Sequence, residues 1–139
     1  TYLHDILKVD SLDVRFPHRV GLHQGCHGLR ELGMGSPSEE MVPPHSKVAN
    51  LLSLVEGLTI VDLKRPDECC GFGGSFSVME EAVSCSMGRD RIADHCEAGA
   101  EVIAGADTSC LMHLEGLERR AGGSLRFLHV AEILAGTTQ

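Results

Sequence analysis

Short apolar segments alternate along this chain with longer segments whose apolar residues recur at helical spacing, and this alternation most constrains the fold. The β-branched and apolar runs predict four strands, over residues 19–23, 58–63, 101–104 and 125–128. Helical spacing predicts helices over residues 2–9, 27–32, 76–98, 111–120 and 130–134, and a further helix that begins at Ser46 and that Gly57 ends. Such alternation favours an α/β fold, here a small three-layer parallel sheet of about four strands with helices on both faces.

The connections between these elements determine where a ligand would bind. In a parallel sheet, right-handed crossovers bring the loops that follow the strands to one edge, at the carboxyl ends of the strands. Ligands of open α/β sheets bind at this edge. The one long loop, residues 33–47, contains three Pro, two Gly and three Ser. The 139 residues are expected to form a single domain, spanning 1–139.

Composition and charge exclude several classes of function. Twelve Lys and Arg against twenty Asp and Glu give a net charge of −8. This is the wrong sign for binding the phosphate backbone of a nucleic acid. The chain has no Trp and one Tyr, so it lacks stacking platforms for single-stranded nucleic acid. No apolar run has the length of a membrane span, and no signal sequence opens the chain. We therefore expect no nucleic-acid partner and no membrane-spanning segment.

Six Cys and eight His are a rich supply of metal ligands for a chain of this length. Three disulfides are one interpretation, but the chain is long enough to bury a core and lacks the loop-dense character of a disulfide-stabilised secreted domain. Free thiols in a reducing compartment are favoured, which predicts a cytoplasmic protein. Thiols in such a compartment are usually buried, catalytic or bound to metal.

Four of the cysteines follow the carboxyl ends of predicted strands. Cys26 follows the first strand, Cys69 and Cys70 the second, and Cys110 the third. Helices are predicted to begin beside Cys26 and Cys110, and exposed N–H groups at a helix start favour a thiolate over a thiol. Because thiolates bind soft and borderline metal ions, this placement predicts a metal site at one edge of the sheet.

The pair Cys69-Cys70 is the most informative dipeptide. Neighbouring side chains of a strand point to opposite faces, so two adjacent ligands require a tight turn, which Gly71 permits. The alternative, two small buried hydrophobic residues, is weakened by Cys26 and Cys110 at the same edge. The glycines that follow do not match a dinucleotide-binding fingerprint, because the third glycine would fall at Phe76.

The remaining cysteines and histidines carry weaker signals. Cys85 and Cys96 recur with Val78, Ala82 and Ile92 along one predicted helix, which is typical of a core stripe. His113 lies one helical turn after Cys110 and is predicted to be either a ligand or a polar neighbour of a sulfur. Three other histidines border the same edge, where contact with a bound centre competes with surface or capping roles: His23, His27 and His129.

The sequence resembles the cysteine-rich "CCG" domain in the order of its motifs, which are Cys26, Cys69-Cys70-Gly71 and Cys110-x-x-His113. This domain occurs in the cysteine-rich component of heterodisulfide reductase, in the iron–sulfur components of glycolate oxidase and anaerobic glycerol-3-phosphate dehydrogenase, and in the lactate-utilisation protein A family. The strings around the motifs are most similar to the last of these: 23–33 (His-Gln-Gly-Cys-His-Gly-Leu-Arg-Glu-Leu-Gly), 69–76, 109–113 and 129–134.

The resemblance implies an iron–sulfur electron-transfer domain of a lactate- or glycolate-oxidising complex that catalyses no turnover by itself. It implies a [4Fe–4S] cluster, non-cubane in the heterodisulfide reductase branch, on Cys26, Cys69, Cys70 and Cys110, with His113 nearby. Full-length relatives carry two such domains in tandem, so it also implies that this chain is the second of the two. Its partners would be the amino-terminal CCG domain and the other subunits of the complex.

Two other functions stay open at this stage. The first is a zinc-binding structural or docking domain that uses four thiolates, or three thiolates and His113. The second is thiol–disulfide chemistry at Cys69-Cys70, where a bond between sequence neighbours would be strained and labile.

Overall fold

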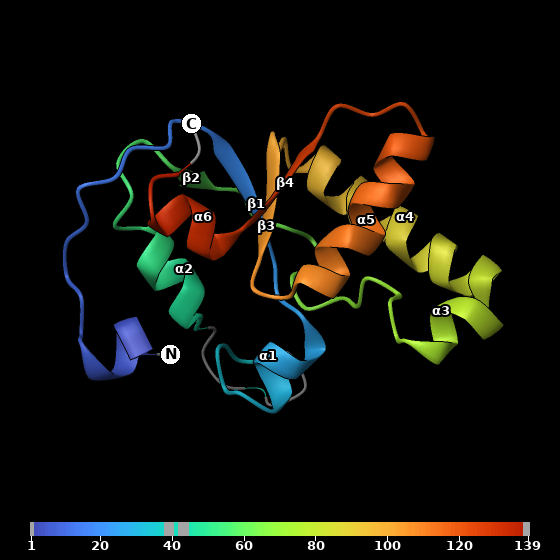
Figure 1. The fold of residues 1–139 in the computed structure, drawn as a ribbon, viewed down its shortest axis with the longest axis horizontal. Helices are drawn as coiled ribbons and strands as arrows, with labels where there is room; N and C mark the ends of the chain where they lie inside the picture. The colour runs from blue at the N-terminus through green and yellow to red at the C-terminus, as the bar shows by residue number, and fades with distance from the viewer. Residues whose placement is uncertain (1, 38–40, 42–44, 138–139) are drawn as a thin grey trace.

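Four parallel strands form one sheet in a computed structural model, which describes residues 2–37, 41 and 45–137. The strand order is β2-β1-β3-β4, with β1 and β3 at the centre (Figure 1). The strands are β1 (Arg19–His23), β2 (Thr59–Ile60), β3 (Val102–Gly105) and β4 (Arg126–His129). The helices are η1 (Tyr2–Ile6, a π-type turn), α1 (Cys26–Arg30), α2 (Lys47–Leu52), α3 (Ser75–Met79), α4 (Glu81–Glu97), α5 (Thr108–Arg120) and α6 (Val130–Leu134).

Helices cover both faces of the sheet, which confirms the predicted three-layer α/β fold. α2 and α6 pack on one face and α4 and α5 on the other (Figure 1). Alternate residues of β1 separate the two layers: Val20 and Leu22 join the apolar core under α2 and α6, whereas Gly21 faces His95 of α4.

The two core clusters differ in size. The cluster under α2 and α6 consists of buried apolar side chains: Phe16, Val20, Leu22, Val48, Leu52, Val55, Val102, Ala104, Leu128, Val130 and Ile133. The cluster under α4 and α5 is smaller and includes two of the cysteines: Cys70, Ile92, Cys110, Leu114 and Leu117. Two of the candidate ligands, Cys70 and Cys110, are thus part of this second core.

The predicted strand over 58–63 is shorter in the structure. β2 pairs with β1 only at Thr59 and Ile60, and Val61 donates one more hydrogen bond to Val20. The next backbone N–H groups, of Lys64 and Arg65, donate to the carboxylate of Asp94 in α4. This edge strand ends early because the chain turns away to α4. Part of the predicted loop, residues 38–40 and 42–44, lies outside the described residues.

The predicted helix over 76–98 divides at Glu80, whose φ of −121° and ψ of 51° are not helical. This break separates Val78 from the other residues of the predicted core stripe, and the stripe is wrong within α4 as well. Val78, Ala82 and Cys96 are exposed, Cys85 is partly buried against the core, and only Ile92 is fully buried. The buried face of α4 carries small and polar residues instead: Ser84, Gly88, Arg91, Asp94 and His95.

No helix among residues 2–37, 41 and 45–137 combines the length and the hydropathy that crossing a membrane requires.

Candidate metal centre

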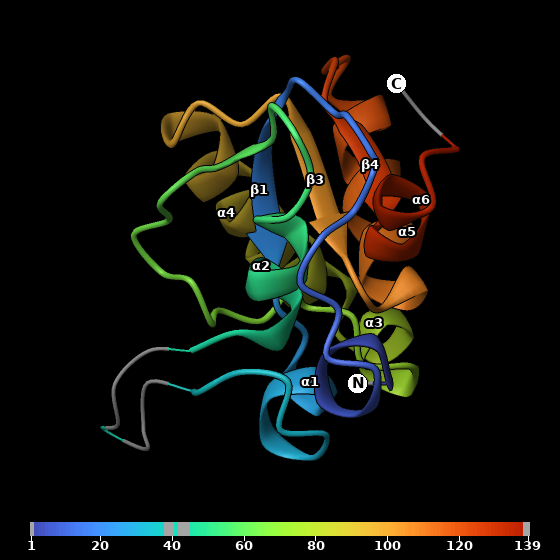
Figure 2. The same ribbon diagram turned by 90° about the vertical axis from the view of Figure 1, so that its left-hand side faces the viewer.

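The two central strands deliver their following loops to one end of the sheet. The connection after β1 leads outward to β2, whereas the connection after β3 leads to β4 on the other side. The last residues of the two strands, His23 and Gly105, are paired in register. α1 and α3 both lie beyond this end (Figure 1, Figure 2). A crevice between strands whose connections diverge in this way is where α/β sheets bind ligands.

All four predicted cysteine ligands line one cavity at this end of the sheet. Its volume is about 310 Å³. The walls come from the ends of β1 and β3, the starts of α1 and α5, and the loop before α3: His23, Cys26, His27, Cys69, Cys70, Phe72, Gly73, Gly74, Asp107, Ser109 and Cys110. Residues more than eighty positions apart in the sequence therefore meet at one site.

A glycine allows the loop that carries Cys69 and Cys70 to turn against α4. Gly71 has a φ of +90°, and a Cβ there would lie 2.5 Å from the Ser84 carbonyl oxygen. The Ser84 hydroxyl donates to the Gly71 carbonyl at 2.7 Å, which fixes the turn against α4. The turn expected after Cys69-Cys70 is thus present, and it needs glycine for both conformation and space.

The four thiols form a continuous series. Cys26 is within hydrogen-bonding reach of Cys69, Cys69 of Cys70, and Cys70 of Cys110. Two backbone N–H groups of the same turn donate to sulfur: that of Gly71 to Cys69, and that of Phe72 to Cys70, each at 3.4 Å. N–H donors of this kind orient sulfur ligands and influence the potential of a bound cluster.

Crowding of the sulfur atoms controls their acidity. Burial, followed by the neighbouring Cys69, raises the pKa of Cys26. The hydrogen bond with Cys70 raises the pKa of Cys69 well above its usual range, and the hydrogen bond with Cys110 raises the pKa of Cys70 to about 11. The expected thiolate at the start of α1 is therefore wrong for the metal-free protein, because burial and adjacent sulfur outweigh the helix terminus.

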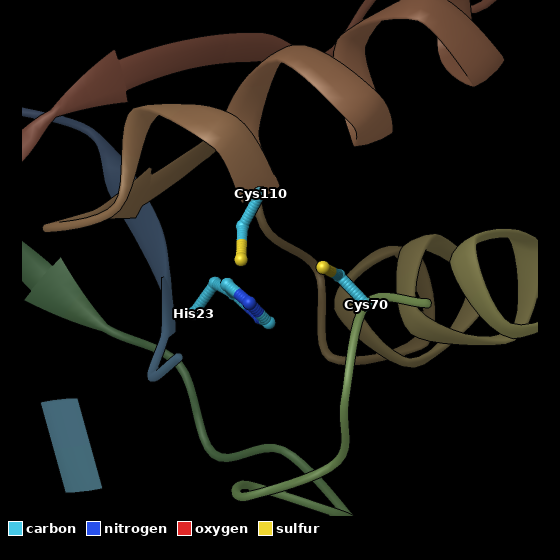
Figure 3. Close-up of side chains that lie close together, drawn as sticks. All are labelled: His23, Cys70 and Cys110. Atoms are coloured by element: carbon cyan, nitrogen blue, oxygen red, sulfur yellow. The ribbon is translucent and has the colours of Figure 1, made fainter. Parts of the chain in front are cut away.

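His23 is the residue at this site whose importance the sequence underestimated. Its ring nitrogen and the Sγ atoms of Cys70 and Cys110 all lie within 4.8 Å of one another (Figure 3). The side chain is buried, and neither ring nitrogen has a hydrogen-bond partner among the described residues. Burial, followed by the Arg91 guanidinium, lowers the pKa of His23 to about 4, so the ring is neutral. Its position as the last residue of a central strand was the available signal.

The other predicted histidines are arranged differently. His113 lies outside the cavity, where its Nε2–H donates to the Ser84 carbonyl at 3.3 Å and its ring lies 6.0 Å from that of Phe72. His129 caps α6 by accepting from the backbone N–H of Ala131 at 3.0 Å. His27 lines the cavity but is exposed. The prediction of His113 as a ligand stays a prediction.

A buried ion pair on α4 holds the segment that precedes Cys69. The side chains of Arg91 and Asp94 are fully buried and 3.2 Å apart. Arg91 donates to the Arg65 carbonyl, and the Asp94 carboxylate accepts from the N–H groups of Lys64 and Arg65, each at 3.0 Å. These hydrogen bonds fix the backbone at Arg65, four residues before Cys69. They therefore position the turn that carries two of the four thiols.

The chain is similar to a family of cysteine-rich proteins. Residues 20–115 match the family model CCG, described as a cysteine-rich domain. Lactate utilization protein A of an Exiguobacterium strain is 38% identical over 133 residues, which make up 96% of this chain and 50% of that protein. Proteins of the same name from Bacillus cereus and Bacillus thuringiensis are 35% and 34% identical over 96% of this chain and 52% of their own length. The chain thus spans about half the length of these relatives.

Proposed function

The chain belongs to the family of cysteine-rich domains described by the CCG model, and we propose that it is an iron–sulfur electron-transfer domain of a system that oxidises lactate or a related 2-hydroxy acid. The observation that carries the proposal is that Cys26, Cys69, Cys70 and Cys110 line one cavity at the switch point of the sheet. The substrate class comes from relatives named for lactate utilization.

The donor set fits an iron–sulfur cluster. Four thiols are the usual ligands of such clusters. The cavity has a volume of about 310 Å³, which is more room than a single ion requires. A bound cluster would accept and pass on single electrons.

The chain's own residues would hold and tune that group. The thiolates of Cys26, Cys69, Cys70 and Cys110 would be its ligands, and the N–H groups of Gly71 and Phe72 would donate to two of the sulfurs. Because the pKa of Cys26, Cys69 and Cys70 is raised in the metal-free protein, binding would release protons and would be favoured by higher pH. Phe72 on the cavity wall would limit access of water.

The proposed partners follow from the length of the relatives. The chain covers about half of each of them, which supports a further domain in the whole protein. From the family resemblance we propose that this chain is the second of two tandem cysteine-rich domains. Electrons would then pass between this domain, its tandem partner and other subunits of the oxidising system.

Zinc binding is the second candidate, and one observation favours it. The ligand atoms of His23, Cys70 and Cys110 lie within 4.8 Å of one another, a spacing close to that of ligands around a single ion. Thiol–disulfide chemistry is less well supported, because the raised pKa of Cys69 and Cys70 makes both thiols poor nucleophiles at neutral pH.

The test is analysis of iron and acid-labile sulfide, with a visible absorption spectrum, on protein prepared without oxygen. We expect several iron and sulfide per chain and broad visible absorbance, both lost in Cys69→Ser and Cys110→Ser. Cys96→Ser is the matched control, since Cys96 is exposed and outside the cavity. One zinc per chain without sulfide would contradict the electron-transfer proposal and favour the zinc-binding alternative.

A further inference from the structure

We propose that His23 is a direct ligand of the metal centre, which therefore combines a nitrogen donor with thiolates. This inference rests on the proposed metal-binding function of the cavity and adds a fifth protein ligand atom to it. His23 precedes the first predicted cysteine ligand by three residues and ends the central strand β1.

The first argument is the state of the His23 ring. The residue is 3% exposed, and neither Nδ1 nor Nε2 has a hydrogen-bond partner among the described residues. Buried polar atoms are rarely left without a partner, because burial removes their hydrogen bonds to water. A metal ion would provide the missing interaction, and a neutral imidazole is the form that binds metal.

The second argument is distance. The ligand atoms of His23, Cys70 and Cys110 fit within 4.8 Å of one another. Two thiolates bound at about 2.3 Å to one ion are at most roughly 4.6 Å apart, and an imidazole nitrogen binds at about 2.0–2.1 Å. Small side-chain movements would therefore place all three atoms on one metal ion. Figure 3 shows the three side chains converging from β1, from the loop before α3 and from the start of α5.

The third argument comes from a second histidine of the same kind. His95 is also fully buried, and its ring nitrogens also lack partners among the described residues. Its ring packs on Gly21, where a Cβ would collide with it, and it is not part of the cluster of ligand atoms. Burial alone therefore does not distinguish His23. Its convergence with Cys70 and Cys110 does, and His95 provides a matched control.

A nitrogen ligand has a measurable consequence. Replacement of thiolate by imidazole raises the reduction potential of an iron–sulfur centre, because a neutral ligand stabilises the oxidised state less than an anionic one. We therefore expect His23→Cys to lower the potential and His23→Leu to weaken metal binding by at least about tenfold.

The experiment uses pulsed electron paramagnetic resonance on the reduced, iron- and sulfide-reconstituted protein to detect nitrogen coupled to the metal. In parallel, metal-free protein is loaded with Co²⁺ alone, and X-ray absorption counts nitrogen and sulfur ligands. We expect nitrogen in wild type, in His95→Leu and in His113→Gln, and its loss in His23→Leu. Thermal unfolding provides a second readout: metal-free His23→Leu should be at least as stable as wild type but gain no stability from metal.

The outcomes separate this inference from the proposed function. Iron–sulfur binding without coupled nitrogen, or nitrogen that persists in His23→Leu and disappears in His113→Gln, would overturn the role of His23 alone. Nitrogen from His23 in a protein that binds Co²⁺ but no iron–sulfur would support His23 and overturn the electron-transfer proposal. Failure to bind either probe would overturn both. A metal-free His23→Leu protein that does not fold would contradict the inference, since it would indicate a structural role for the ring.

Discussion

The two sides of the sheet bury different kinds of side chain. The side under α2 and α6 is an apolar core in which Phe16, Leu52 and Ile133 are fully buried. The side under α4 and α5 buries Arg91, Asp94, His95 and other polar groups close to the sheet. Two of the four cysteines that line the cavity, Cys70 and Cys110, belong to the core cluster of this second side.

This difference indicates that the apolar side mainly stabilises the fold, whereas the polar side also positions the cysteines. Apolar burial contributes most of the favourable free energy of folding but is not directional. Hydrogen bonds and ion pairs are directional, and on the α4 side they fix the backbone of residues 64–71 and thus the positions of Cys69 and Cys70. Disturbing the apolar side should therefore reduce stability alone, whereas disturbing the polar side should also reduce metal binding.

The largest effect is expected from Asp94→Asn. This change breaks the buried pair with Arg91 and weakens the hold on the N–H groups of Lys64 and Arg65. Removing one partner of a buried ion pair costs about 4 kcal/mol in the free energy of unfolding, because it leaves an uncompensated charge. Urea denaturation would measure the loss, and metal analysis of the folded protein should show reduced metal per chain.

Glu97→Gln is the control for Asp94→Asn. Glu97 joins the same segment to α4 through Lys64, at 2.7 Å, but both side chains are exposed. Exposed ion pairs contribute little, so the unfolding curve and the metal content should match those of wild type. Equal losses of stability and metal content in Asp94→Asn and Glu97→Gln would refute the importance of the buried Arg91–Asp94 pair.

Leu52→Ala tests the apolar side. Leu52 is fully buried in the cluster under α2 and α6. Truncation of a buried Leu costs about 3 kcal/mol, through lost burial and the cavity that remains. We expect a lower urea midpoint and unchanged metal content per folded chain. Metal loss as large as that of Asp94→Asn would show that the two sides are not independent.

Gly71→Ala tests the turn itself. The φ of +90° and the 2.5 Å approach to the Ser84 carbonyl make a methyl group unfavourable in conformation and in space. Strain of this kind costs about 2 kcal/mol, and we expect metal binding to weaken with it. The control is Gly122→Ala, which has a φ of +73° but no atom within 4 Å of the new Cβ. Similar metal content in the two variants would rule out the close approach as the important feature.

Periodicity and turn chemistry predicted the fold and the gathering of the cysteines well. The α/β fold and its four parallel strands are confirmed, and Cys26, Cys69, Cys70 and Cys110 meet at the predicted edge. These predictions succeed because topology places every loop that follows a strand at one end of the sheet. The α2 side also agrees, with Val48, Leu51, Leu52 and Val55 buried as their spacing indicated.

The α4 side could not be predicted in the same way. A backbone break at Glu80 separates Val78 from α4, and the pattern of apolar residues does not show it. The buried face of α4 is polar because Arg91 and Asp94 pair within it, Asp94 accepts from backbone N–H groups, and His95 packs on Gly21. None of these interactions requires an apolar period. His23 was underestimated for the same reason, since its value comes from contacts with residues distant in sequence.

The last prediction is a dependence of stability on pH, and it again distinguishes the two sides. Burial, followed by Arg91 and His23, lowers the pKa of His95 to about 3, although Asp94 acts in the opposite direction. The ring therefore stays neutral in the folded protein, whereas in the unfolded chain it takes up a proton below about pH 6.5. Its contribution to stability is complete above pH 6.5 and is lost as the pH falls toward 3, at up to about 1.4 kcal/mol per pH unit.

Urea denaturation of the metal-free protein at pH 7, 6 and 5 would measure this loss. We expect the free energy of unfolding of wild type to fall over this range and His95→Leu to fall by less, because one proton-binding difference has been removed. Leu52→Ala should keep the wild-type slope, since it changes only the apolar side. Equal slopes in wild type and His95→Leu would mean that this ring does not lower stability in acid.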